Sequence, residues 1–177
     1  MKNMERVKRE LVYKGTIIKV YKDYMKIKGN DAIWDYFELP GGAAIVPVLE
    51  NGNVLLVKQY RNAMNEYVLE LPAGKFDSKE ESGERCVKRE LTEETGYVAK
   101  EVTHLLTIRS LIAFSDERVE IFAATNLIPG KQKLDEEEEI ELVEYSIAEL
   151  KEMIFEGEIQ DSKTVAGLLA YMQKYDL

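Results

Sequence analysis

A short run of acidic residues constrains this chain more than any other feature. Glu90, Glu93 and Glu94 lie at helical spacing in a stretch that reads as a helix over residues 82–95. Each residue of a helix turns by about 100°, so Glu90 and Glu94 stack on one strip of its surface. The sequence therefore predicts two carboxylates side by side on one helix.

The strip that carries Glu90 and Glu94 borders the apolar side of this helix. It falls between Val87 and Leu91 on one side and Cys86 on the other. A solvated helix places its acids opposite its apolar stripe. Like charges four residues apart repel each other, which is costly near a buried face unless a cation compensates them. Because oxygen ligands suit hard divalent ions, the pattern favours Mg2+ or Mn2+.

The same stretch resembles the signature of a known family. The run Arg89-Glu90-Leu91-Thr92-Glu93-Glu94-Thr95-Gly96-Tyr97 is similar to the second half of the Nudix box, G-x5-E-x7-R-E-U-x-E-E-x-G-U, where U is a bulky apolar residue. Counting back from Arg89 makes Glu81 the isolated glutamate of the pattern, whereas counting forward from Gly74 makes it Glu80. This box is therefore one residue longer than the pattern, and the choice between Glu80 and Glu81 stays open.

The resemblance implies an α+β protein with the Nudix fold, an α/β/α sandwich with a mixed sheet. It divides the chain into a small antiparallel N-terminal β segment at residues 1–40 and a Nudix hydrolase domain at residues 41–177. Residues 7–39 suit the first part, since they are rich in strand-favouring side chains. In relatives that resemble ADP-ribose pyrophosphatases, such a segment helps to build a homodimer.

Composition and charge exclude several other classes of protein. The chain has 177 residues and a net charge of −9 with no basic run, which argues against nucleic acid as the main partner. No apolar run approaches the length of a membrane span. The single cysteine, Cys86, can form no intramolecular disulfide. A cytoplasmic protein that acts on a small molecule is expected, and an anionic substrate would need local basic groups and a metal.

Hydrophobic runs predict the elements of the main domain. Residues 41–48 form a continuous small and apolar run, as expected of a strand buried on both faces. Asn51-Gly52 is a hairpin signal, which makes residues 54–60 the predicted partner of that strand. Further strands are predicted at 67–71, 102–110, 119–124 and 140–145, and helices at 147–156 and 162–174.

The resemblance also assigns roles around the box. It implies that Glu90 and Glu94 bind the metal directly, that the backbone carbonyl of Ala73 is a further ligand, and that Glu81 ligates another metal or its water. Arg89 would pair with an acid of the helix and fix its rotamer.

Hydrolysis further needs a base that acts on water. Some Nudix enzymes use a glutamate of the box, where Glu93 lies close to the ligands, whereas the ADP-ribose type uses a late acidic loop. That loop corresponds here to residues 135–139, and alignment on the following strand favours Glu136 and then Glu138. Five consecutive acids are also typical of a solvated segment, so both interpretations stay open.

Three residues outside the box are candidates for substrate binding. Arg61 directly follows the strand at 54–60, and by resemblance its planar fork contacts a substrate phosphate. Trp34, the only tryptophan, is either a packing or dimer contact or a stacking face for a purine base. Glu117 by resemblance helps to hold substrate or metal-bound water, although a solvated turn is the simpler interpretation.

These features predict Mg2+-dependent hydrolysis of the diphosphate bond of ADP-ribose or a related nucleoside diphosphate sugar, giving AMP and ribose 5-phosphate. Hydrolases of other nucleoside diphosphate sugars, such as GDP-mannose, share the features, so the base and the sugar stay open. A second class is a Nudix-like domain that senses ADP-ribose without cleaving it. Such proteins commonly lose box glutamates, whereas Glu90, Glu93 and Glu94 are all present here.

Overall fold

The computed structural model describes residues 3–177, which divide into two compact units. The first unit contains the chain up to Gly41 together with Arg109–Arg118. The second contains Gly42–Ile108 and Val119–Leu177. The predicted N-terminal segment, residues 1–40, does not include Arg109–Arg118, which are far from it in the sequence.

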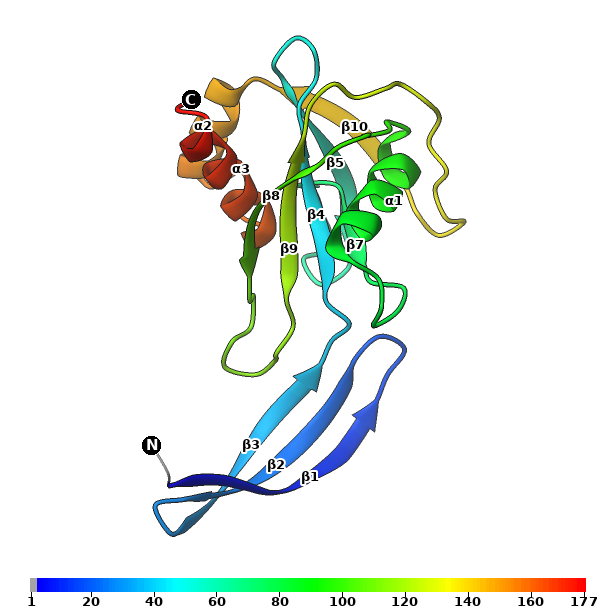
Figure 1. The fold of residues 1–177 in the computed structure, drawn as a ribbon. Coiled ribbons are helices and arrows are strands. Elements are labelled where there is room, and N and C mark those ends of the chain that lie inside the picture. Colours follow the sequence, from blue (N-terminus) through cyan, green and yellow to red (C-terminus); the bar gives the residue numbers. More distant parts are fainter. Residues whose placement is uncertain (1–2) are drawn as a thin grey trace. The chain divides into compact units, whose positions relative to one another are not determined.

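The first unit is built on a three-stranded antiparallel sheet in the order β1-β2-β3 (Figure 1). Its strands are β1 (Met4–Lys14), β2 (Lys19–Ile27) and β3 (Asn30–Glu38). Lys28 and Gly29 both have positive φ angles, 51° and 88°, as a tight turn between β2 and β3 requires. The added segment is held at β3, where the N–H of Phe37 donates to the carbonyl of Phe114 over 2.7 Å.

One ion pair ties the first two strands together. Asp23 of β2 is 8% exposed, and both of its carboxylate oxygens accept hydrogen bonds of 2.6 Å from Arg9 of β1. The hydrogen bonds from Arg9 lower the pKa of Asp23 below its ordinary value. The pair is therefore charged at neutral pH and stabilises the register between the two strands.

The second unit contains two sheets and three helices. A four-stranded sheet has the order β7-β4-β9-β8, and a three-stranded sheet has the order β10-β5-β6. Only β4 and β9 pair in parallel, so the first of these sheets is mixed. The elements are β4 (Gly42–Pro47), β5 (Val54–Arg61), β6 (Glu66–Glu70), β7 (Ala73–Lys75), α1 (Gly83–Thr95), β8 (Thr103–Ile108), β9 (Val119–Ala124), β10 (Ile140–Tyr145), α2 (Ile147–Glu156) and α3 (Ser162–Lys174).

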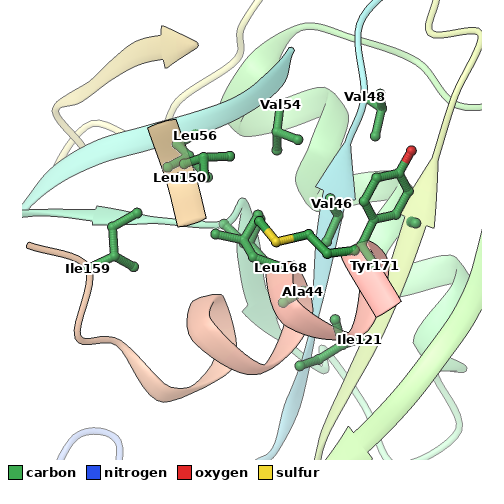
Figure 2. Close-up of a cluster of buried hydrophobic side chains, with 13 residues drawn as sticks. Ala44, Val46, Val48, Val54, Leu56, Ile121, Leu150, Ile159, Leu168 and Tyr171 are labelled. Carbon is green, nitrogen blue, oxygen red and sulfur yellow. The ribbon is translucent and has the colours of Figure 1, made fainter. Parts of the chain in front are cut away.

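Strand β4 lies at the centre of this unit, and all six of its residues are buried. Its side chains alternate between two cores, because successive residues of a strand face opposite sides. Ala43 and Ile45 join the cluster beneath α1, whereas Ala44 and Val46 join the cluster beneath α2 and α3 (Figure 2). Figure 1 shows α1 on one side of the sheet and α2 with α3 on the other. The prediction of a strand buried on both faces is confirmed.

The predicted partner of that strand was wrong. A turn does form at Gly52, which has a φ of 84°, but only one bridge, between Val48 and Val54, links the two strands. Strand β4 is flanked by β7 and β9, and β5 instead pairs with β6 and β10. Strands from later in the chain thus pair with both edges of β4, and β5 is the central strand of the second sheet.

The helix boundaries follow local capping signals. Ser146 forms a capping box with Glu149 at the start of α2, and Gly157 ends that helix with a φ of 81°. Asp161 caps the start of α3. Both helices have the predicted boundaries. Among residues 3–177, no helix combines the length and the apolar composition needed to cross a bilayer.

Candidate active site

Helix α1 carries the acidic cluster, and its ends are fixed by local sequence. The hydroxyl of Ser82 accepts from the N–H of Arg85 at the start, and Gly96 ends the helix with a left-handed φ of 76°. Cys86, Val87 and Leu91 are fully buried against β4 and β9. This packing fixes the rotation of α1, and with it the direction in which the acids point.

Arg89 stands at the centre of the carboxylates. Its Nη1 donates to Glu90 over 2.7 Å and to Glu93 over 3.0 Å, and its Nη2 lies 3.4 Å from Glu81. Nη2 also donates to the carbonyl of Lys75 over 3.0 Å. Burial opposes the charge of this guanidinium, but its bonds to Glu81 and Glu90 raise the pKa of Arg89 above its ordinary value. Arg89 thus contacts three acids of the cluster, Glu81, Glu90 and Glu93.

Burial raises the pKa values of two acids of the cluster, Glu94 and Glu90. Glu94 is 4% exposed, and burial raises its pKa to about 8, with the charges of Glu90 and Glu138 adding to the shift. Its Oε2 accepts from the N–H of Ala73 over 3.0 Å. Burial likewise raises the pKa of Glu90, whose carboxyl lies directly over Gly74. Two carboxylates are therefore desolvated side by side, which a bound cation would stabilise.

The structure brings Glu81, rather than Glu80, to this cluster. Glu81 is 9% exposed, and its Oε2 accepts from the N–H of Asp77 over 2.8 Å. Burial opposes its ionisation, but Asp77 and Arg89 together lower the pKa of Glu81. Glu80 is exposed, and its backbone N–H donates to the hydroxyl of Ser78 over 3.2 Å. The extra residue of the box therefore lies before Glu81.

The segment that leads into the acidic loop is hydrogen-bonded to the end of α1. The side-chain amide of Gln132 donates to the carbonyl of Glu94 over 2.6 Å, and the N–H of Lys133 donates to the carbonyl of Glu93 over 2.8 Å. Further along, the N–H of Asp135 donates to Glu138 over 3.2 Å. The acidic loop therefore begins close to the last turn of α1, which carries Glu93 and Glu94.

Of the two candidate bases in this loop, Glu138 has a charge that acts on the buried acids. Its charge contributes, after burial, to the raised pKa values of both Glu90 and Glu94. Glu136 is exposed, and neither buried acid has Glu136 among the main causes of its shift. The fold therefore favours Glu138, which alignment on the following strand had ranked second.

Arg61 also belongs to this region. It ends β5, and its Nε and Nη2 donate to the two oxygens of Glu70 over 2.5 and 2.8 Å. The charge of Arg61 also acts on Glu94, where it opposes the effect of burial on the pKa. A cavity of about 1040 Å³ borders this group, and Arg61, Glu70 and Lys163 are among its lining residues.

Two predicted binding residues lie in the first unit. Trp34 is on β3 and is 49% exposed. Glu117 follows a turn in the segment Arg109–Arg118, where its N–H donates to the hydroxyl of Ser115 over 3.0 Å. Their roles toward a substrate stay predictions.

The donor set of the cluster fits a divalent metal ion. In the present arrangement of residues 3–177, no three His, Cys, Asp or Glu side chains are gathered around a single point, and Arg89 stands among the acids. The cluster carries four negative charges when its acids are ionised, and Arg89 supplies one positive charge. The four acids are Glu81, Glu90, Glu93 and Glu94. The excess of buried negative charge and the purely oxygen donors are what Mg2+ or Mn2+ would satisfy.

Comparison with known proteins decides the family. The sequence matches the family model of the NUDIX domain over residues 39–168. The chain belongs to the Nudix family. It is 32% identical to the ADP-ribose pyrophosphatase of Bacillus subtilis (strain 168), over 98% of this chain and 95% of that protein. It is 38% identical to the GDP-mannose pyrophosphatase of Yersinia enterocolitica, over 72% of this chain and 70% of that protein.

A solved structure agrees on the fold. The crystal structure of an ADP compounds hydrolase matches with a TM-score of 0.89, covering 99% of this chain and 96% of that one at 20% identity. The predicted Nudix fold with its N-terminal antiparallel strands is confirmed, and so is the assignment to the Nudix pyrophosphohydrolases. Members of this family generally use divalent metal ions.

Sequence reasoning missed several residues of this region. Glu70, Gln132 and Lys163 were not recognised, since Lys163 meets Glu70, and Gln132 meets Glu94, across a large separation in sequence. A signal existed for Lys163, because it lies in the first turn of α3, where the helix dipole disfavours a cation. A lysine placed there indicates a nearby anion, although the sequence does not say which one.

Proposed function

We propose that this Nudix protein hydrolyses the diphosphate bond of ADP-ribose, giving AMP and ribose 5-phosphate. The observation that carries the proposal is the cluster of Glu81, Glu90 and Glu94 around Arg89, in which two buried acids have raised pKa values. The near full-length similarity to an ADP-ribose pyrophosphatase supports this substrate.

We propose Mg2+, or Mn2+, as the metal. Glu90 and Glu94 would hold it, together with Glu81 and the backbone carbonyl of Ala73. When bound, such an ion neutralises charge on the phosphate oxygens and lowers the pKa of a bound water. Arg89 holds Glu90 and Glu93 in fixed rotamers, and the acids would turn from Arg89 toward the ion when it binds.

The remaining groups bind the substrate and act on water. Arg61 presents its Nη1 to a phosphate, because Nε and Nη2 are already paired with Glu70. Glu138, ahead of Glu136, accepts the proton of the attacking water, since it is the acid of the loop whose charge reaches Glu90 and Glu94. Glu93 is the alternative base within the box.

We further propose a cytoplasmic homodimer formed through the first unit. The sheet β1-β2-β3 and the turn between β1 and β2 expose many large apolar side chains. They are Met4, Val7, Leu11, Val12, Tyr13, Ile17, Ile18, Ile33 and Trp34. In the dimer, Trp34 would stack on the base and Glu117 would help to hold substrate. The single thiol, Cys86, is buried and suits a reducing compartment.

Phosphate release tests the proposal directly. Purified protein is offered ADP-ribose, ADP-glucose, GDP-mannose and 8-oxo-dGTP with a coupling phosphatase, with and without Mg2+. Glu94→Gln serves as the metal-site control, because it removes a proposed ligand with little change in volume. We expect Mg2+-dependent turnover that is fastest on ADP-ribose and nearly absent in the variant.

The relative that acts on GDP-mannose supports a second candidate substrate. Faster turnover of GDP-mannose would keep the mechanism and change the base and the sugar. Absence of turnover with every substrate, while ADP-ribose still raises the melting temperature, would refute the hydrolase and favour a sensor.

A further inference from the structure

A second charged group adjoins the acidic cluster and has Glu70 at its centre. Glu70 is 3% exposed, and both of its oxygens accept from Arg61, over 2.5 Å from Nε and 2.8 Å from Nη2. The Nζ of Lys163 donates to the same carboxylate. Burial opposes the ionisation of Glu70, but Arg61 and Lys163 hold its pKa below the ordinary value. One buried anion is thus shared by two cations.

Lys163 is fixed in place by the start of α3. It lies in the first turn, where the helix dipole disfavours a cation. Asp161 caps the helix, and its Oδ2 accepts from the N–H of Thr164 and from the Nζ of Lys163, each over 3.0 Å. The hydroxyl of Thr164 in turn accepts from the N–H of Leu71 over 2.9 Å. The start of α3 is therefore fastened to the end of β6, next to Glu70.

The charge of Lys163 balances one of the acids around Arg61. Arg61 and Lys163 carry two positive charges, and Glu70 and Asp161 carry two negative charges, so the group is neutral. Without the lysine, Arg61 would face two acids and have a net negative environment. An anionic diphosphate would then be repelled from the Arg61 guanidinium, and Glu70 would be less firmly oriented.

We propose that Lys163 is a positioning residue, which acts through Glu70 to hold the Arg61 guanidinium beside Glu94 and which offsets one of the negative charges around that guanidinium. This inference rests on the proposed function for the role of Arg61 toward phosphate. The placement of Arg61 by Lys163 is a separate physical statement and can be measured without turnover.

Kinetics and NMR test the two statements separately. Lys163→Gln removes the charge, Lys163→Arg keeps it, and Lys174→Gln makes the same charge change in the last turn of the same helix. ADP-ribose hydrolysis is followed across substrate and Mg2+ concentrations. The Nε–H signal of Arg61, assigned with Arg61→Lys, reports its bond to Glu70 in each protein.

We expect kcat/KM of K163Q to fall about 10- to 100-fold, the usual loss when a supporting residue is removed. The Mg2+ concentration for half-maximal activity should stay unchanged, because Glu90 and Glu94 are untouched. The Arg61 Nε–H signal should move toward that of a solvated arginine. K163R should recover both properties, and K174Q should match the wild type.

Several results would overturn the inference. They are an unshifted Arg61 signal in K163Q, wild-type kcat/KM in that variant, or a K163R that behaves like K163Q. Should K163Q not fold, the wild type provides its own test: a Lys163 ammonium signal that exchanges with water as fast as that of Lys174 would refute the pairing. Wild-type protein that turns over no substrate, with the NMR results as expected, would refute the proposed function and leave the placement of Arg61 standing.

Discussion

A single methyl group added at Gly74 should disable the metal site while leaving the fold nearly intact. Gly74 lies on β7 beneath the carboxyl group of Glu90, and a Cβ built there would overlap both carboxyl oxygens and the carbon between them. Rotation of the carboxyl group alone cannot relieve that overlap, so the Glu90 side chain must move away. The backbone of Gly74 does not have a positive φ, so alanine introduces no conformational strain there.

The expected magnitudes differ strongly between stability and activity. Displacing Glu90 breaks its 2.7 Å hydrogen bond to Arg89, and a bond between charged groups contributes about 1.5–3 kcal/mol. The departure of a buried acid from a cluster of like charges offsets part of that loss, so the free energy of unfolding should fall by about 1–2 kcal/mol. Loss of a metal ligand costs several kcal/mol of transition-state stabilisation, which corresponds to about a 10²- to 10³-fold fall in kcat/KM.

The assay compares Gly74→Ala, Glu90→Gln and the double variant for phosphate release and for urea unfolding. Gly83→Ala is the matched control, since a Cβ there would overlap the carboxyl of Glu120, which is not a proposed ligand. We expect the first two variants to lose similar activity and the double variant to lose no more, with activity retained in the control. Wild-type activity in Gly74→Ala, or losses that multiply in the double variant, would refute the reasoning.

Three further predictions concern the base, the aromatic face and the N-terminal sheet. Glu138→Gln should lower kcat much more than Glu136→Gln in the same phosphate-release assay; equal and small effects would mean that the acidic run is only solvated. Trp34→Ala should raise KM for ADP-ribose more than it lowers kcat if the ring stacks on the base, and an unchanged KM would make it a structural residue. Asp23→Asn should lower the free energy of unfolding at neutral pH. Because Arg9 lowers the pKa of Asp23, the stabilisation is present above the ordinary pKa of about 3.9 and is lost as the pH falls through the lower pKa of the folded state. Urea unfolding at several pH values measures the difference from wild type, and a difference that persists at the most acidic pH would contradict the assignment.

The box helix shows why much of the site could be predicted. Its cap at Ser82, its C-terminal Gly96 and its apolar stripe are local features, and together they fix which way Glu90 and Glu94 point. The predicted boundaries of α2 and α3 are also correct, and the structure shows local caps at Ser146 and Asp161 that explain where the two helices begin.

The choice between neighbouring acids could not be made in this way. Glu80 and Glu81 differ by one position, and only the bond from Asp77 and the approach of Arg89 distinguish them. Glu136 and Glu138 likewise differ only through the path of the loop over the end of α1. A shift of one residue changes which side chain reaches the cluster, and the local sequence does not indicate which of two neighbouring acids that is.

The resemblance of residues 89–97 to a known signature indicated the family, and hydrophobic periodicity predicted the helices and most strands, because both are properties of short segments. The same local pattern supplied the acids that we propose as metal ligands. Tertiary structure alone decided that β4 pairs with β7 and β9 instead of β5, since strand pairing depends on which distant segments compete for an edge. It also decided that Glu70 is shared by Arg61 and Lys163, which lie on β5 and α3. A buried charge must find a partner wherever the fold supplies one, and that partner is set by packing across the whole unit.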